Sequence, residues 1–293
     1  MGQRLNGKVA VVTGGGGGIG RGVVLAMHAE GAAVVVSDAG VKPDGTKAAD
    51  VVVAEVKKLG GKAVASYDSV TTIVSGQKII DTAVNTFGRV DVLVNCAGRQ
   101  PPIGPLWEND PDDWVRTIEV NLLGTFHCIQ AVLPGMIARH QGKIINFSGG
   151  GATGPRPNFS AYAASKAAIV RLTETLAEEL RPSNIQVNAV APGAINTGML
   201  EEVLAAGKAA GAELAAAQSR KAQGGTPIEL AARLVVFLAS RASGSLTGKL
   251  ISAPHDGWQT WDAEDVARLA DSPWYTLRRI DEHTLRPLLK SLK

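Results

Sequence analysis

Short runs of β-branched and apolar residues alternate along this chain with longer stretches of helical periodicity. Most of the runs are continuously apolar, which is typical of strands covered on both faces, as in a parallel sheet. Strands are predicted at residues 9–13, 33–37, 63–66, 90–95, 142–147, 185–190 and 249–252. Helices are predicted at residues 20–30, 46–59, 73–87, 112–139, 161–180 and 228–240. This alternation predicts an α/β fold with a doubly wound parallel sheet between two layers of helices.

Two segments stand apart from the alternating pattern. Residues 198–225 are rich in Ala, Gly and Gln, and we interpret them as a mobile insertion between a strand and the next helix. Residues 254–293 follow the last predicted strand and contain most of the tryptophans of a chain that is otherwise poor in aromatic residues. Within them, Ser272 and Pro273 have the features of a helix N-cap and first helical residue. We therefore expect one catalytic domain over residues 1–253 and a C-terminal extension that packs on it or on a neighbouring subunit, since free tryptophans would be unfavourable in water.

The first predicted strand runs directly into a glycine-rich turn and then into a helix. Gly14, Gly18, Ile19 and Gly20 belong to this turn, which contains five consecutive glycines. Glycines let the backbone approach a pyrophosphate closely, and the helix N-terminus offers N–H groups and partial positive charge. The alternative is a flexible turn without a ligand, but a run of glycines is entropically costly, so the sequence favours a dinucleotide cradle.

Polar and small residues follow the next three predicted strands, where a dinucleotide would extend. Asp38 ends the second strand, and its carboxylate can accept hydrogen bonds from ribose hydroxyls and would repel a 2′-phosphate. This favours NAD over NADP, although a loop or helix-capping Asp is the plainer interpretation. Further cofactor contacts are expected at the ends of the third and fourth strands, from Asp68, Ser69, Asn95, Ala97 and Gly98.

Tyr162 and Lys166 stand four residues apart in a helical stretch, so their side chains share one helix face. A free phenol is a poor base at neutral pH, but a nearby ammonium lowers its pKa. Such a tyrosine can exchange a proton with an alcohol or carbonyl oxygen. The pair alone is equally compatible with an amphipathic helix that carries both residues by chance.

Taken in order, these motifs resemble the short-chain dehydrogenase/reductase family of the classical type, over about residues 5–252. They comprise the glycine turn, Asp38, Asn95-Cys-Ala-Gly98, Asn121-Leu-Leu-Gly124, Asn146-Phe-Ser148, Tyr162-x-x-x-Lys166 and Pro192-Gly193. The resemblance implies a single Rossmann-like domain, usually in a homotetramer or homodimer. It also implies reversible hydride transfer between a small-molecule alcohol or ketone and the nicotinamide.

The resemblance assigns roles to individual positions. Tyr162 corresponds to the general acid/base, and Lys166 to the residue that lowers its pKa and binds the nicotinamide ribose. Asn121 corresponds to the residue that holds a water in a proton relay through Lys166. The carboxamide of the nicotinamide is expected to bind along one segment, at Pro192, Gly193, Ile195 and Thr197.

One departure concerns the residue that orients the substrate oxygen. The family usually has Ser at the position of Gly149, whereas Ser148 lies one residue earlier. The glycines after it would let the backbone turn Ser148 into the site, so we expect Ser148 to be catalytic. The alternative is that Ser148 points into the sheet and that another group orients the substrate.

Three functions remain in view at this point. The first is an NAD-dependent alcohol dehydrogenase, and the second is an NADPH-dependent reductase of 3-oxoacyl thioesters, against which Asp38 argues. The third is a non-catalytic, dinucleotide-binding regulatory subunit, supported only by Gly149. The substrate is not readable from the sequence. Arg156 would suit a carboxylate substrate, but an exposed loop arginine is the simpler expectation.

Composition limits partners and location. The net charge is +3, and no block of Lys and Arg is dense enough for a nucleic-acid groove. Cys96 and Cys128 lie in apolar sequence, which favours two thiols over a disulfide, and no metal-ligand spacing joins His127 and His255. We expect no metal, and a cytoplasmic protein without a membrane partner, because no signal peptide or long apolar span is recognisable.

Overall fold

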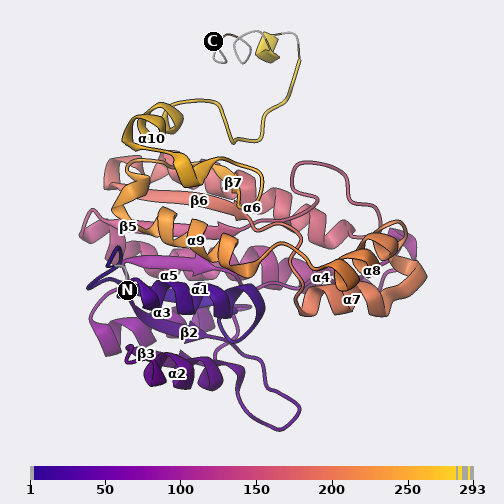
Figure 1. The fold of residues 1–293 in the computed structure, drawn as a ribbon, viewed down its shortest axis with the longest axis horizontal. Coiled ribbons are helices and arrows are strands. Elements are labelled where there is room, and N and C mark those ends of the chain that lie inside the picture. Colours follow the sequence, from indigo (N-terminus) through magenta and orange to yellow (C-terminus); the bar gives the residue numbers. More distant parts are fainter. Residues whose placement is uncertain (1–2, 282, 286–289, 291–293) are drawn as a thin grey trace.

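The computed structural model describes residues 3–281, 283–285 and 290. Its seven strands form one parallel sheet in the order β3-β2-β1-β4-β5-β6-β7 (Figure 1). The strands are β1(Val9–Thr13), β2(Ala33–Ser37), β3(Ala63–Ser66), β4(Val92–Asn95), β5(Gly142–Phe147), β6(Ile185–Ala191) and β7(Leu250–Ser252). This sheet, with helices on both faces, confirms the predicted Rossmann-like, doubly wound fold.

In the described part of the chain, three helices cover each face of the sheet. Helices α1(Gly18–Ala29), α2(Ala48–Lys58) and α9(Ile228–Ala239) bury their apolar sides in the core on one face. Helices α3(Ile73–Phe87), α5(Gly124–Ala138) and α6(Ser160–Glu179) contribute to the core on the other face. The predicted helices therefore agree with those observed to within about two residues at each end.

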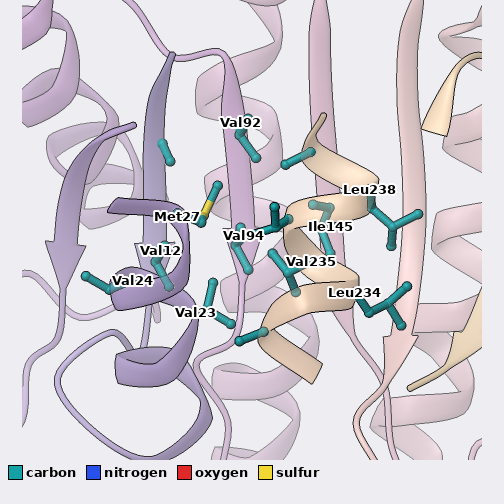
Figure 2. Packing of buried hydrophobic residues seen from close by; sticks show 14 of the residues in the cluster. Val12, Val23, Val24, Met27, Val92, Val94, Ile145, Leu234, Val235 and Leu238 are labelled. Carbon is teal, nitrogen blue, oxygen red and sulfur yellow. The ribbon is translucent and has the colours of Figure 1, made fainter. Parts of the chain in front are cut away.

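Neighbouring residues of each central strand serve opposite cores. Val12 and Val94 pack with α1 and α9, as Figure 2 shows, whereas Val11 and Leu93 pack in the core under α3 and α5. Side chains alternate between the two faces of a strand, so a strand covered on both faces must be apolar at every position. The continuous apolar runs in the sequence follow from this arrangement.

The long helix predicted at residues 112–139 has a wider turn in its middle. Helix α4(Pro111–Ile118) continues through the π-helical turn η2(Glu119–Leu123) into α5, and Asn121 lies within that turn. By length and composition alone, Pro111–Ala138 is apolar enough to cross a membrane. However, Cys128 and Met136 are completely buried in the core, as expected of a core helix in a globular protein.

The segment interpreted as a mobile insertion contains two helices. Helices α7(Gly198–Ala206) and α8(Glu213–Gln223) pack on each other and lie side by side in Figure 1, and an ion pair between Lys221 and Glu201 joins them at 2.9 Å. Gly207 and Gly211 between them have positive φ angles, which glycine adopts readily. The sequence interpretation missed these helices because the short glycine-flanked stretches lack a long apolar period.

The C-terminal extension contacts the body of the protein. Trp258 is buried in the core cluster next to α9, and Trp261, Trp274 and Tyr275 pack against that cluster. The backbone N–H of Leu250 in β7 also donates to the carbonyl of Tyr275 at 2.7 Å. The division into a domain of residues 1–253 and an extension of 254–293 stays a prediction, and residues 282, 286–289 and 291–293 of it lie outside the described residues.

The prediction that Ser272 and Pro273 begin a helix is wrong. Helix α10(Ala263–Ala270) ends before them, and its N-cap is Asp262, whose carboxylate accepts from the backbone N–H groups of Glu264 and Asp265. Ser272 instead donates its hydroxyl hydrogen to the carbonyl of Leu269 at the end of this helix. A serine before a proline is compatible with either end of a helix. The helix begins after Asp262 instead, because Asp262 caps its N-terminus.

Candidate active site

The glycine turn between β1 and α1 brings the backbone very close to its neighbours. A Cβ on Gly14 would lie 2.9 Å from the backbone of Ala97, and one on Gly20 would lie 2.0 Å from the carbonyl oxygen of Gly14. The N-cap of α1 is Gly17, which makes no side-chain capping bond to the first N–H groups of the helix. Those groups are therefore available to an anion, and the turn fits a pyrophosphate.

A cleft of about 470 Å³ extends from this turn along the ends of the strands. Asp38 is fixed at its rim, because its carboxylate accepts from the N–H of Gly16 at 2.9 Å and from that of Gly40 at 2.8 Å. Asp68 also lines the cleft, with a carboxylate oxygen 3.9 Å from the ammonium nitrogen of Lys78. The cleft contains most of the predicted dinucleotide contacts, namely Gly14, Gly18, Ile19, Gly20, Asp38, Asp68, Ser69, Ala97, Gly98 and Thr197.

Asn95 is the predicted cofactor contact that the structure places elsewhere. Its side chain is buried and donates to the Oδ1 of Asn146 at 2.9 Å, and Asn146 in turn donates to the hydroxyl of Thr173 at 2.9 Å. The asparagine therefore ties β4 to β5 and, through Thr173, to α6. This network lies beside the cleft and supports the strand ends from which Ala97 and Gly98 line it.

Tyr162 and Lys166 lie on one face of α6, as predicted, and both are buried. The Lys166 ammonium nitrogen is 5.5 Å from the centre of the Tyr162 ring and donates to the carbonyl of Phe147 at 2.8 Å. Burial raises the pKa of Tyr162 to about 12 and lowers that of Lys166 to about 8. The predicted lowering of the Tyr162 pKa by Lys166 is thus not found in the protein alone, because the cost of burying charge dominates.

Gly149, not Ser148, faces the Tyr162 hydroxyl. A Cβ on Gly149 would lie 2.6 Å from that oxygen. Ser148 is buried, and its hydroxyl points toward α6, where it donates to the carbonyl of Lys166 at 3.4 Å. This is neither the orientation toward Tyr162 that we expected nor the alternative into the sheet, and the orienting role of Ser148 stays a prediction.

Asn121 reaches the site from the π-helical turn. Its amide nitrogen donates to the carbonyl of Arg99 and to the hydroxyl of Ser165, and its oxygen accepts from the N–H of Arg99 at 2.9 Å. A Cβ on Gly98 would lie 3.3 Å from the Asn121 oxygen and 3.6 Å from the Lys166 nitrogen. Asn121 and Lys166 therefore flank the same small residue, and π-helical turns are frequent at functional sites.

A second cleft of about 770 Å³ contains Tyr162 and Lys166 and shares part of its lining with the first. Ile19, Cys96, Thr197 and Met199 line both cavities, so a ligand can extend from the glycine turn to Tyr162. The predicted residues that line this second cleft are Tyr162, Lys166, Ser148, Pro192, Gly193, Ile195 and Thr197. The cradle, the acidic rim and the tyrosine–lysine pair thus lie along one continuous groove.

Comparison with known proteins accounts for this groove. Residues 8–208 match the model of the short chain dehydrogenase family. This chain belongs to the short-chain dehydrogenase/reductase family. As a member, it is an oxidoreductase that uses a nicotinamide dinucleotide.

Individual members of the family are similar over most of the chain. The 3-oxoacyl-[acyl-carrier-protein] reductase of Thermotoga maritima is 37% identical over 251 residues, which cover 85% of this chain and 97% of that protein. Two solved structures share the fold with a TM-score of 0.75, and each match covers 85% of this chain and 94% of the other. They are a 7α-hydroxysteroid dehydrogenase with NADH and 7-oxoglycochenodeoxycholic acid, 33% identical, and a gluconate 5-dehydrogenase of Burkholderia cenocepacia with NADP and tartrate, 31% identical. Other curated relatives are longer multifunctional enzymes, and the chain spans about a quarter of their length.

Arg156 is the residue of this site that the family resemblance did not single out. The expectation of an exposed loop arginine is wrong, since its side chain is only 12% exposed and forms a two-pronged ion pair with Glu213. Its guanidinium carbon lies 3.9 Å from the ring centre of Phe159 and 5.2 Å from that of Tyr162. No local sequence signal predicts a pairing between residues that stand 57 positions apart.

The remaining titratable groups supply no metal centre within the described residues. No group of three or more His, Cys, Asp or Glu side chains gathers there in a way that could hold a metal ion. Cys96 and Cys128 are free thiols, and burial raises the pKa of each to about 12. The Nδ1–H of His127 donates to the carbonyl of Val70 at 2.9 Å and thereby links α5 to the loop before α3.

Proposed function

We propose that this protein is an NAD-dependent dehydrogenase that reversibly oxidises a small-molecule secondary alcohol to a ketone. The observation that carries the preference for NAD is the position of Asp38. Two backbone N–H groups fix its carboxylate at the rim of the dinucleotide cleft. A fixed negative charge there accepts hydrogen bonds from ribose hydroxyls and repels a 2′-phosphate.

The residues of the groove divide the proton and hydride chemistry between them. Bound NAD supplies the acceptor for the hydride that leaves the carbinol carbon. Tyr162, as phenolate, takes the proton of the substrate hydroxyl and returns one to the carbonyl oxygen in the reverse direction. Lys166 favours this phenolate and holds the ribose hydroxyls. Asn121 fixes the backbone of Arg99 through two hydrogen bonds. It also lies near the Lys166 ammonium, where it holds a water of the proton relay.

Steady-state kinetics with both cofactors test the cofactor preference. We expect kcat/KM to be higher with NAD than with NADP in a screen of secondary alcohols, hydroxy acids, sterols and sugars. Replacing the carboxylate by Asp38→Asn should narrow this difference, because the amide no longer repels the 2′-phosphate. Equal or better kcat/KM of the unmodified protein with NADP would overturn the proposal.

A second candidate function is the reduction of 3-oxoacyl thioesters. The match to the Thermotoga maritima reductase favours it, since it covers nearly the whole of that protein. Its catalytic residues would be the same, so only substrate and cofactor distinguish the two. Turnover of a 3-oxoacyl thioester with NADPH that exceeds every alcohol oxidation with NAD would establish the reductase instead.

The orienting role of Ser148 is decided by a single substitution. Loss of a hydrogen-bond donor to developing charge costs about a hundredfold or more in kcat. Ser148→Ala with such a loss and unchanged NAD affinity would make Ser148 the orienting residue. A change below about threefold would leave it the structural partner of the Lys166 carbonyl.

Homotetrameric or homodimeric assembly and cytoplasmic location remain part of the proposal and are tested by sedimentation and by imaging of the tagged protein.

A further inference from the structure

Arg156 lines the second cleft and is held there by a residue of the α7–α8 segment. Its Nε and Nη2 donate to the two carboxylate oxygens of Glu213 at 2.5 and 2.6 Å. The two side chains are 12% and 30% exposed. Two parallel bonds between a guanidinium and a carboxylate fix direction as well as distance, so the position of Arg156 depends on where α8 lies.

Gln100 completes the clamp from the loop after β4. With its amide oxygen facing Arg156, it accepts from Nη1 at 3.2 Å, and its amide nitrogen donates to the carbonyl of Met199 in α7 at 3.1 Å. Gln100 is buried, so these two bonds satisfy groups that water does not reach. Arg156 therefore connects the loop before α6 with α7, α8 and the loop after β4.

These bonds hold the guanidinium group of Arg156 over two aromatic rings. Its carbon lies 3.9 Å from the ring centre of Phe159 and 5.2 Å from that of Tyr162, where a cation is attracted to a ring face. The glycine run makes room for this arrangement. A Cβ on Gly151 would lie 3.2 Å from the Cβ of Arg156, which is closer than ordinary contact.

We propose that Arg156 is a positioning residue for proton transfer, which stabilises the phenolate form of Tyr162 while Glu213 and Gln100 hold it in place. The docking of the α7–α8 segment is thereby coupled to the acidity of the catalytic tyrosine. This inference rests on the proposed function of Tyr162 as acid/base. It assigns to Arg156 a share in stabilising the phenolate, a role that the sequence analysis gave to Lys166 alone.

The charges around Tyr162 support the sign of this effect. The titratable and charged groups that face it are Lys166 of α6, Arg156 of the preceding loop, Cys96 after β4, Glu202 of α7 and Glu213 of α8. Burial raises the Tyr162 pKa most, Arg156 opposes this increase, and Cys96, Glu213 and Glu202 add to it. Removing the guanidinium must therefore raise the pKa, because the phenolate loses an opposite charge.

The experiment is a pH profile of kcat/KM for alcohol oxidation with the full chain and NAD. Arg156→Gln should move the acidic limb to higher pH by about one pH unit, as expected for removal of a charge 5.2 Å from the Tyr162 ring centre in a partly screened site. Lys221→Gln is the matched control, because it removes a cation from the same segment by breaking the exposed pair with Glu201. The control profile should not move.

A second measurement is independent of turnover. The chain has three tyrosines, so Tyr67→Phe and Tyr275→Phe leave Tyr162 as the only phenol that titrates. In this background the phenolate absorbance should develop at higher pH with Arg156→Gln than without it. The double variant Arg156→Gln, Glu213→Gln removes both charges of the ion pair and guards against misfolding of the single variant. It should still titrate at higher pH than its parent.

The outcomes separate this inference from the proposed function. An unshifted titration of both Arg156 variants, or an equal shift with Lys221→Gln, would overturn the role of Arg156. If the unmodified protein oxidised no alcohol, the proposed function would fail. The absorbance titration would still decide whether Arg156 controls the acidity of Tyr162.

Discussion

Gly149 determines how much room the Tyr162 hydroxyl has. A Cβ at this position would lie 2.6 Å from the phenolic oxygen, so Gly149→Ala must displace one or the other. Misplacement of a reacting group by about 1 Å can cost a hundredfold in rate. We expect Gly149→Ala to lower kcat by about that factor while calorimetry finds NAD affinity unchanged.

The adjacent glycine provides the control for this prediction. A Cβ on Gly150 would meet its nearest neighbours, in the Arg156 side chain, only at 3.9 Å, which is ordinary contact. Gly150→Ala should therefore retain most of the activity. Similar losses for both variants would show that the backbone freedom of the run matters, rather than the space in front of Tyr162.

Tyr162→Phe should lower kcat by about a hundredfold or more, because the phenol is the only proposed proton acceptor for the substrate. NAD binding should be nearly unchanged, since the hydroxyl acts on the substrate oxygen. The measurement is steady-state turnover together with calorimetric titration of NAD. Retention of most of the turnover would show that the acid/base lies elsewhere.

Local spacing made some of these residues predictable and left others hidden. Tyr162 and Lys166 are one helical turn apart, so the sequence alone places them together. Asp38 and Ala97 follow strands whose ends meet at one edge of a parallel sheet. Arg156 and Glu213 come from separate loops and helices, and their contact depends on how the α7–α8 segment docks. The orientation of the Asn95 side chain also could not be predicted, because it depends on a hydrogen bond to Asn146 in another strand.

At the scale of single elements, α10 depends on its N-cap. The Asp262 carboxylate accepts two backbone hydrogen bonds at the start of this helix, and the Asp265 carboxylate accepts one from the backbone N–H of Asp262. We expect Asp262→Ala to lower the free energy of unfolding by about 1 kcal/mol, measured by chemical denaturation. Glu264→Ala removes a charge from the same turn but leaves the cap, so its effect should be smaller.

Elements were predictable where burial on both sides imposed a pattern. The strands β1, β2 and β5 match the predicted bounds, because two packed faces require apolar residues at every position. The helices α7 and α8 were missed, since few of their residues are buried and glycines interrupt the stretch. The π-helical turn at Asn121 was not predicted either, as a helix with one wider turn has nearly the same apolar period as a regular one.

For the whole molecule, the extension contributes to the core rather than only covering it. Trp258 is 5% exposed and donates its indole N–H to the carbonyl of Ala253. Val266 and Leu269 of α10 belong to the same buried cluster. Deleting residues 258–293 should therefore lower the free energy of unfolding by about 3 kcal/mol or more, as for loss of a buried tryptophan.

Denaturation and sedimentation of the truncated protein measure this effect. A shorter truncation that removes residues 286–293 is the control, because it leaves every aromatic residue named above in place. It should keep the oligomeric state of the full chain and lose less stability than the longer truncation. If the longer deletion changed neither the free energy of unfolding nor the oligomeric state, a structural role for the extension would be contradicted.

The hydrogen bond from Leu250 to the Tyr275 carbonyl has a consequence for solubility. Strand β7 is the last strand of the sheet, and an open sheet edge offers its backbone groups to any extended chain. The extension occupies part of this edge in the same molecule. Its retention therefore guards against edge-to-edge aggregation, and a truncated protein should form β-rich aggregates faster than one whose core alone has been weakened.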